Sequence, residues 1–242
     1  MPPEIFLTIA ITAFIQSIFG AGVLLFGTPL LLLLGYPFVD VLVVLLPVSL
    51  VINLLQILKH HPHVDVVLYR KILLLTLPPI AIFLFLVTHI RLNIGLVIGP
   101  FLLLIALKEL STASARLIDR LMRHETVYCV VMGVVHGISN LGGSLLTALV
   151  HHKNYQKDVA RVTIAACYGT FALIQLLTLW LFTRQQIDVP IYDDVIYLTV
   201  GALVFVFTDE TFYNRIDRRK YRRIFAGFLA LSGLILIGKG LS

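Results

Sequence analysis

The most constraining feature of this sequence is a stretch of 35 residues without formal charge, Ile5 to Val39, interrupted by Gly20-Ala21-Gly22. A single helix of that length would extend about 50 Å, whereas the hydrocarbon core of a bilayer is about 30 Å thick. The stretch must therefore bend, break or double back. A second stretch, Thr126 to His152, has 27 residues without formal charge and is interrupted by Ser139-Asn140-Leu141-Gly142-Gly143. We therefore expect two interrupted helical segments of the same kind.

The composition indicates an integral membrane protein. Hydrophobic residues make up 59% of the 242 residues and charged residues 13%, with a mean hydropathy of +0.96. A soluble domain could not solvate such a surface. The start, Met1-Pro2-Pro3-Glu4, lacks the positive region of a signal peptide, so the first apolar segment is expected to remain in the protein. The spacing of Cys129 and Cys167 fits neither a metal site nor a disulfide framework, and no metal, cofactor or nucleic acid is expected.

The distribution of basic residues predicts how the apolar segments cross the membrane. Eight segments can be drawn: Ile5–Leu34, Val41–Leu58, Ile72–Ile90, Leu92–Leu107, Thr126–Val150, Val162–Thr183, Val195–Thr208 and Ile224–Gly238. If all eight crossed once, Lys and Arg would divide nine to ten between the two sides, without the usual bias. If the first and fifth segments are re-entrant, sixteen of the nineteen lie on one side.

The positive-inside rule therefore favours an all-α polytopic membrane protein with two re-entrant helical hairpins, each followed by three transmembrane helices. Both termini are then predicted outside, in a bacterial-type inner membrane. The alternative for Gly20-Ala21-Gly22 is a small-residue packing seam in one long tilted helix.

The two halves of the chain also align weakly with each other. Phe19–Leu25 lies over Asn140–Leu146 at an offset of 121 residues. Two further pairs match at an offset of 119: Tyr36 with Tyr155, and Gln56 with Gln175. Three crossings per half is an odd number, so the second half is predicted to be inverted, as in many secondary transporters. The expected organisation is one domain, 1–242, with repeat one at 1–110, an amphipathic cytoplasmic linker at 111–125 and repeat two at 126–242.

The breaks are predicted to form a site for a small anion. The backbone amides that open each second arm, near Gly22-Val23-Leu24 and Gly143-Ser144-Leu145, are expected to lack intrahelical partners and to lie at the positive end of a helix dipole. Neutral polar side chains surround both breaks. The candidate substrate-binding residues are Gln16, Ser17, Gly20, Gly22, Asn53, Gln56, His136, Ser139, Asn140, Gly142, Gly143, Ser144 and Gln175. For any single residue, a hydrogen bond between helices is the alternative role.

No Lys or Arg lies deep in an apolar segment, so the anion is expected to be held by dipoles and neutral hydrogen bonds. His136 is the only ionisable side chain at either break, which makes it a candidate for proton coupling, with a neutral hydrogen-bonding role as the alternative. The basic cluster Arg215–Arg223 is expected to contact anionic lipid. A homo-oligomer is left open.

Several motifs resemble a known family. Gly20-Ala21-Gly22, Gly27-Thr28-Pro29-Leu30-Leu31 and Leu34-Gly35-Tyr36-Pro37 resemble the N-terminal signature of the sulfite exporter TauE/SafE family, and Gly137 with Gly142-Gly143 resembles its second copy. The second copy departs where Val150 stands in place of a proline matching Pro29. The resemblance covers nearly the whole chain. It implies a membrane transporter that exports sulfite, sulfonates or related small anions by means of an ion gradient.

Two other classes of function are weighed against a transporter. A passive anion channel of the same architecture is the first alternative, and gradient-coupled accumulation would distinguish it. A membrane-embedded enzyme is not expected, because no Asp or Glu lies inside any apolar segment.

Overall fold

The computed structural model describes residues 2–20, 22–60, 63–90, 93–110, 120–183, 191–212 and 218–241. Its regular elements over these ranges are α-helices, which confirms the all-α prediction. The helices are α1 (Pro3–Phe19), α2 (Val23–Leu33), α3 (Phe38–His60), α4 (Val66–His89), α5 (Ile94–Leu110), α7 (Glu125–Ser139), α8 (Gly143–His152), α9 (Lys157–Phe182), α10 (Ile191–Phe212) and α11 (Arg218–Leu241). The two uncharged stretches are interrupted at their Gly-rich residues, between α1 and α2 and between α7 and α8.

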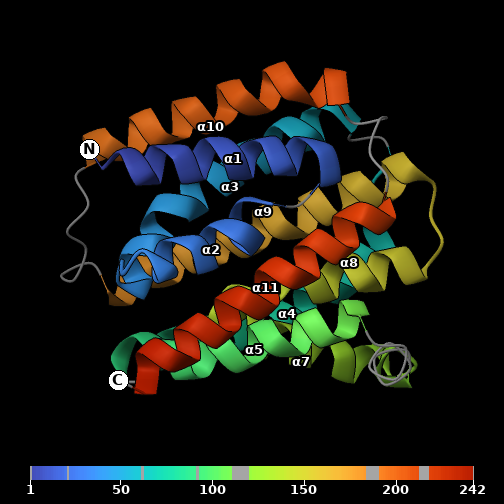
Figure 1. Ribbon diagram of the computed structural model, residues 1–242. Coiled ribbons are helices and arrows are strands. Elements are labelled where there is room, and N and C mark those ends of the chain that lie inside the picture. Colours follow the sequence, from blue (N-terminus) through green and yellow to red (C-terminus); the bar gives the residue numbers. More distant parts are fainter. Residues whose placement is uncertain are drawn as a thin grey trace.

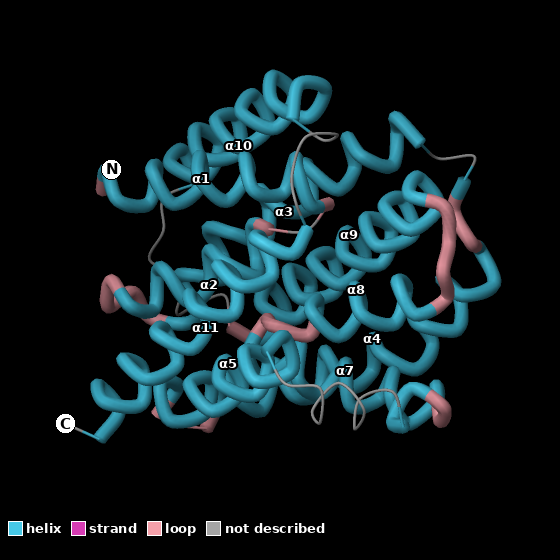
Figure 2. Tube along the Cα trace, turned by 45° about the vertical axis from the view of Figure 1, so that its right-hand side comes forward, coloured by secondary structure: helices cyan, strands magenta, loops and turns pink. Residues whose placement is uncertain are grey.

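The helices form one bundle with α3 and α9 at its centre. In the most apolar stretch of α9, 72% of the residues are buried, against 28% for α4. At one edge α10 packs on α1, and at the other α11 packs on α5 (Figure 1). Figure 2 gives a second view, in which α2, α8 and α9 lie between these edges. The central position of α3 and α9 places their polar residues inside the bundle.

The outer surface of the bundle suits lipid. Three helices in the described part of the chain are long and apolar enough to cross a bilayer: Phe38–Lys59, Val66–His89 and Lys157–Phe182. Shorter apolar helices accompany them: Pro3–Ile18, Val23–Leu33, Ile94–Leu107, Glu125–Ser139 and Ala226–Leu241. Large apolar side chains such as Val67, Leu74 and Phe207 are exposed on the outside, where only a hydrocarbon solvent is favourable. The chain is an integral membrane protein.

A small-residue seam joins α7 to α4. An added Cβ at Gly133 would lie 2.6 Å from the carbonyl oxygen of Thr76, and one at Gly137 would lie 2.7 Å from that of Ile80. The two helix backbones therefore approach closely, as small residues permit in membranes. With Gly133 and Gly137 against α4, the side chain of His136 on α7 reaches α9 instead, where it contacts Gln175.

We refer to α1 with α2 as the first helix pair, and to α7 with α8 as the second. The ends of each pair are tied together. The Tyr36 hydroxyl, just beyond α2, donates to Glu4 at the start of α1 over 2.8 Å. Lys153, just beyond α8, forms an ion pair with Glu125 at the start of α7.

These two ties lie at opposite ends of α3. Tyr36 directly precedes α3, whereas Asp65, which follows α3, accepts a hydrogen bond from the Tyr155 hydroxyl, two residues beyond Lys153. Both chain ends lie at the same side of the molecule (Figure 1). In agreement, Lys239 near the C-terminus donates to the carbonyl oxygen of Leu33 at the end of α2 over 2.7 Å.

Candidate functional site

The first break is a tight left-handed turn. Gly20 ends α1 with φ of 78°, and its N–H donates to the carbonyl oxygen of Gln16 over 2.8 Å. Gly22 precedes α2, and an added Cβ there would lie 2.6 Å from the backbone nitrogen of Gln16. Glycine is required at the first position by its backbone conformation and at the second by the close approach of α1. Ala21, between them, lies outside the described residues.

The Gln16 side chain links both arms of the first pair to α3. Its Oε1 accepts from the Val23 N–H at the start of α2 over 2.9 Å, and its Nε2 donates to Asn53 Oδ1 over 3.2 Å. Asn53 in turn donates to the carbonyl oxygen of Ser49 over 2.7 Å. The partner of the Val23 N–H is therefore a side chain of α1 and not a carbonyl group of α2.

The second break uses the same left-handed turn with a different residue. Asn140 ends α7 with φ of 60°, and its N–H donates to the carbonyl oxygen of His136 over 2.8 Å. An added Cβ at Gly142 would lie 2.5 Å from Cβ of His136, and one at Gly143 would overlap the Tyr168 hydroxyl at 1.0 Å. Both glycines are therefore fixed by packing.

The amides that open α8 are also occupied. The Ser144 N–H donates to the carbonyl oxygen of Leu141 over 3.3 Å, and the Leu145 N–H donates to that of Gly142 over 3.0 Å. The acceptors are carbonyl groups of the loop before α8, in a tighter turn than the α-helix uses, so both amides are occupied.

The His136 side chain occupies the position that Gln16 has at the first break. Its Nε2 lies 3.1 Å from Gln175 Oε1, and both residues are completely buried. Phe171 packs beside the imidazole, with ring centroids 5.1 Å apart. At both breaks, the side chain four residues before the left-handed position therefore meets an amide on a following helix.

This geometry aligns the breaks at an offset of 120 residues, pairing Gly20 with Asn140 and Gln16 with His136. The sequence comparison placed them at an offset of 121. The difference arises because Asn adopts the left-handed conformation more readily than other non-glycine residues, so the second turn does not need a glycine at the matching position.

Several buried polar atoms at the breaks and on the central helices have no hydrogen-bond partner among the described residues. They are both amide atoms of Gln56, Nε2 of Gln175, Nδ1 of His136 and Oδ1 of Asn140. A buried polar atom without a partner costs about 1–3 kcal/mol. Such groups are rare in native proteins unless water or a ligand meets them, so these atoms are candidate contacts for a polar ligand.

The remaining predicted residues divide into two groups. Asn140 Nδ2 donates to Thr28 Oγ1 over 2.9 Å, which joins the second break to the middle of α2. Ser139 and Ser144 donate to backbone carbonyl oxygens of their own segment, at Val135 and Leu141. The hydrogen bond of Asn140 thus joins the second helix pair to the middle of α2.

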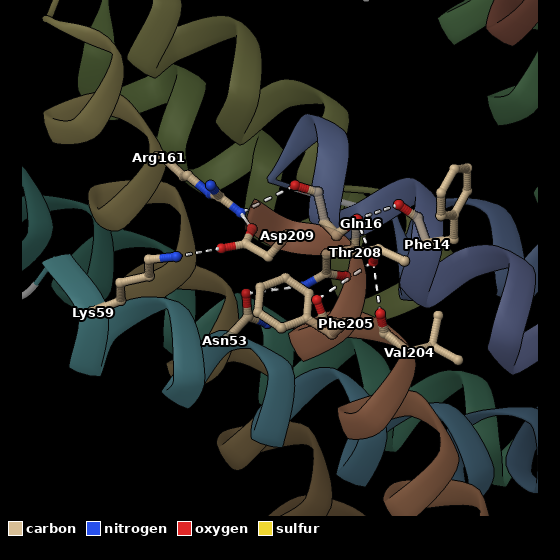
Figure 3. A network of polar contacts seen from close by, with 10 residues as sticks. Phe14, Gln16, Asn53, Lys59, Arg161, Val204, Phe205, Thr208 and Asp209 are labelled. Atoms are coloured by element: carbon tan, nitrogen blue, oxygen red, sulfur yellow. Dashed lines mark hydrogen bonds and ion pairs between the residues drawn. The ribbon is translucent and has the colours of Figure 1, made fainter. Parts of the chain in front are cut away.

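A buried cation that was not predicted from the sequence lies beside the first break. Arg161 of α9 is 5% exposed, forms an ion pair with Asp209 of α10, and donates from Nη2 to the carbonyl oxygen of Ser17 over 3.1 Å. Ser17 also accepts from Thr208 over 2.8 Å (Figure 3). The expectation of dipoles and neutral hydrogen bonds alone did not include this cation. Arg161 directly precedes an apolar segment and was counted with the loop cations, because its burial depends on α10, far along the chain.

No group of three or more His, Cys, Asp or Glu side chains in the described ranges could hold a metal ion. The two cysteines are free and buried. The site is thus built from amides, hydroxyls, one imidazole and one ion pair.

A polytopic helical membrane protein with broken helices and a polar interior belongs structurally with membrane transport proteins. The family model for the sulfite exporter TauE/SafE matches residues 5–236, which include both breaks, Arg161 and Asp209. The chain belongs to this family of membrane transporters for sulfite and sulfonate-type anions. Searches of curated proteins and of solved structures gave no match.

Proposed function

We propose that this protein is a secondary transporter that exports a small oxyanion, such as sulfite or an organosulfonate, by alternating access at the two breaks. The observation that carries the proposal is the set of buried polar atoms of Gln56, His136, Asn140 and Gln175 that have no hydrogen-bond partner among the described residues. These groups are neutral and include both donors and acceptors, which permits release of an anion as well as capture.

The two helix pairs act as re-entrant hairpins of an inverted repeat in this proposal. The ties Tyr36–Glu4 and Lys153–Glu125 support it, because each returns the chain to the side where its helix pair began. Their position at opposite ends of α3 fits hairpins that enter from opposite faces. Both termini then lie outside, and the chain forms one domain with repeats at 1–110 and 126–242. Labelling single cysteines at Arg123 and Asn154 with an impermeant reagent tests this, since they should react from the same face, whereas eight single crossings would place them on opposite faces.

The anion binds at the first break by taking the Val23 amide from Gln16. In the present arrangement the Gln16 carbonyl accepts from that amide, and an oxyanion accepts from the same donor more strongly, at the positive end of α2. The released Gln16 side chain then provides a neutral donor through Nε2, which in the present arrangement donates to Asn53. Gly20, Gly22, Gly142 and Gly143 shape the turns, while Ser17, Ser139 and Ser144 contribute hydroxyl donors nearby.

His136 carries the coupled proton. Its Nε2 meets Gln175, and its Nδ1 has no partner in the described residues, so the ring has a free position for a proton. We expect His136→Gln to transport without the pH dependence of the wild type. Unchanged pH dependence would remove His136 from coupling and leave it a structural role.

Two further proposals concern the cytoplasmic surface. The basic cluster Arg215–Arg223 contacts anionic lipid; its residues 215–217 lie outside the described residues, as do residues 111–119 of the linker. Assembly into a homo-oligomer is a separate prediction, tested by the mass of the protein in detergent.

The transport assignment is tested by uptake of radiolabelled sulfite and of a simple sulfonate into proteoliposomes. An imposed proton gradient should stimulate uptake and drive accumulation above equilibrium. Equilibration that no gradient stimulates would support a passive channel, and no uptake of either compound would remove the sulfur-oxyanion assignment. Empty liposomes provide the background.

A further inference from the structure

A buried ion pair lies directly beside the first break. The side chains of Arg161 and Asp209 are 4% and 6% exposed. Arg161 also donates to Ser17 in the last turn of α1, and a Cβ added at Gly20 would lie 3.4 Å from Cγ of Arg161. The aliphatic part of the Arg161 side chain therefore packs against the turn that ends α1, and its guanidinium group reaches Asp209 (Figure 3).

The pair continues toward the surface of the protein. Lys59 Nζ at the end of α3 lies 3.2 Å from the other carboxylate oxygen of Asp209, and its side chain is 44% exposed. A positive, a negative and a second positive group thus lead from an exposed helix end to the break. Charged groups inside membrane segments are costly and mark ion paths, and a buried ion pair seldom stabilises a fold more than apolar packing does.

We propose that Arg161 is the cationic contact of the transported anion and that Asp209 is the internal counter-anion which Arg161 releases when the substrate arrives. The inference rests on the proposed function and adds to it the charged group that the sequence analysis lacked. A carboxylate and a sulfite or sulfonate group present the same kind of oxygen acceptors to a guanidinium, so one replaces the other without leaving Arg161 unpaired. After the exchange Asp209 is still paired with Lys59.

The exchange also couples binding of the anion to movement of α9 relative to α10. Arg161 ties α9 to α10 through Asp209 and to α1 through Ser17. When the anion takes the place of Asp209, the charged link between α9 and α10 is released. A substrate that binds one arrangement better shifts the protein toward it, and Asp209 favours the arrangement in which α9 and α10 are linked.

The test compares sulfite uptake by the wild type with that of Arg161→Gln, Asp209→Asn and the double variant Arg161→Gln/Asp209→Asn. The double variant removes both charges together and keeps the side-chain shapes, so it avoids an unpaired buried charge. Lys71→Gln is the matched control, because Lys71 pairs with Glu125, which also pairs with Lys153.

We expect the double variant to fold and to raise the KM for sulfite about tenfold or more, the loss of one charge-assisted hydrogen bond. Asp209→Asn should lower the KM, because the competing carboxylate is gone, and Lys71→Gln should leave it unchanged. A double variant with wild-type KM would overturn the inference and make the ion pair structural. Should the wild type itself transport neither sulfite nor a sulfonate, the proposed function fails first and the inference falls with it.

Discussion

Placing a fixed negative charge at the first break should exclude the substrate. In Gln16→Glu, one carboxylate oxygen can still accept from the Val23 N–H, as Gln16 Oε1 does over 2.9 Å, so the start of α2 keeps its partner. An anion on an adjacent donor would lie about 5 Å from that carboxylate, where repulsion amounts to about 3 kcal/mol at an effective dielectric constant near 20. This corresponds to a roughly 200-fold rise in KM.

The assay is initial sulfite uptake against concentration, with thermal unfolding of each purified variant to establish that it is folded. Gln16→Met loses both hydrogen bonds of Gln16 without adding charge and frees the Val23 amide, so its KM should stay within about tenfold of the wild type. Gln156→Glu makes the same charge change at an exposed position before α9 and should have no effect. Equal KM values for Gln16→Glu and Gln16→Met would refute an anion site at the first break.

Three further variants test the turns and the tie between helices. Asn140→Ala should cost about 1–2 kcal/mol more than Asn140→Gly in equilibrium unfolding by sodium dodecyl sulfate, because only glycine accepts the left-handed backbone without penalty. Equal costs would show that the turn relaxes. Gly143→Ala should fail to yield folded protein in size-exclusion chromatography, since its Cβ would overlap the Tyr168 hydroxyl at 1.0 Å; a well-folded variant would place Tyr168 elsewhere. The pKa of Asp65 is held below its ordinary value of 3.8 by the Leu68 N–H and then by the Tyr155 hydroxyl. A carboxyl group whose pKa is lower in the folded than in the unfolded protein stabilises the fold at pH values above its unfolded-state pKa. This stabilisation is lost as the pH falls through its folded-state pKa. Tyr155→Phe should therefore lower Tm most above about pH 4 and converge with the wild type in stronger acid, and a constant Tm difference would contradict the linkage.

Hydropathy and glycine placement were sufficient to predict the helical class and both interruptions. Those features are local, because a long uncharged stretch cannot cross a bilayer straight and a glycine marks where the backbone turns. The same reasoning selected Gln16, Asn53, His136 and Gln175, which the fold brings together in two pairs. Their pairing follows from the positions of polar residues in otherwise apolar helices.

The errors have a common physical origin in contacts between distant segments. Arg161 is buried because α10 brings Asp209 to it, and Asn140 reaches Thr28 across 112 positions of the chain. Gly143 is fixed by Tyr168, which lies on another helix. No local pattern reports such packing. A basic residue five positions into a long helix, directly before an apolar run, was the one available signal for Arg161.

The most direct measurement would locate a bound anion at the first break. Selenite has the charge and pyramidal shape of sulfite, and its selenium atom gives an anomalous X-ray signal. Crystals of the protein grown with selenite should show an anomalous peak within hydrogen-bonding reach of the Val23 amide and Arg161, with Asp209 displaced toward Lys59. A selenium peak at any other position, with the Gln16–Val23 and Arg161–Asp209 contacts intact, would contradict the site.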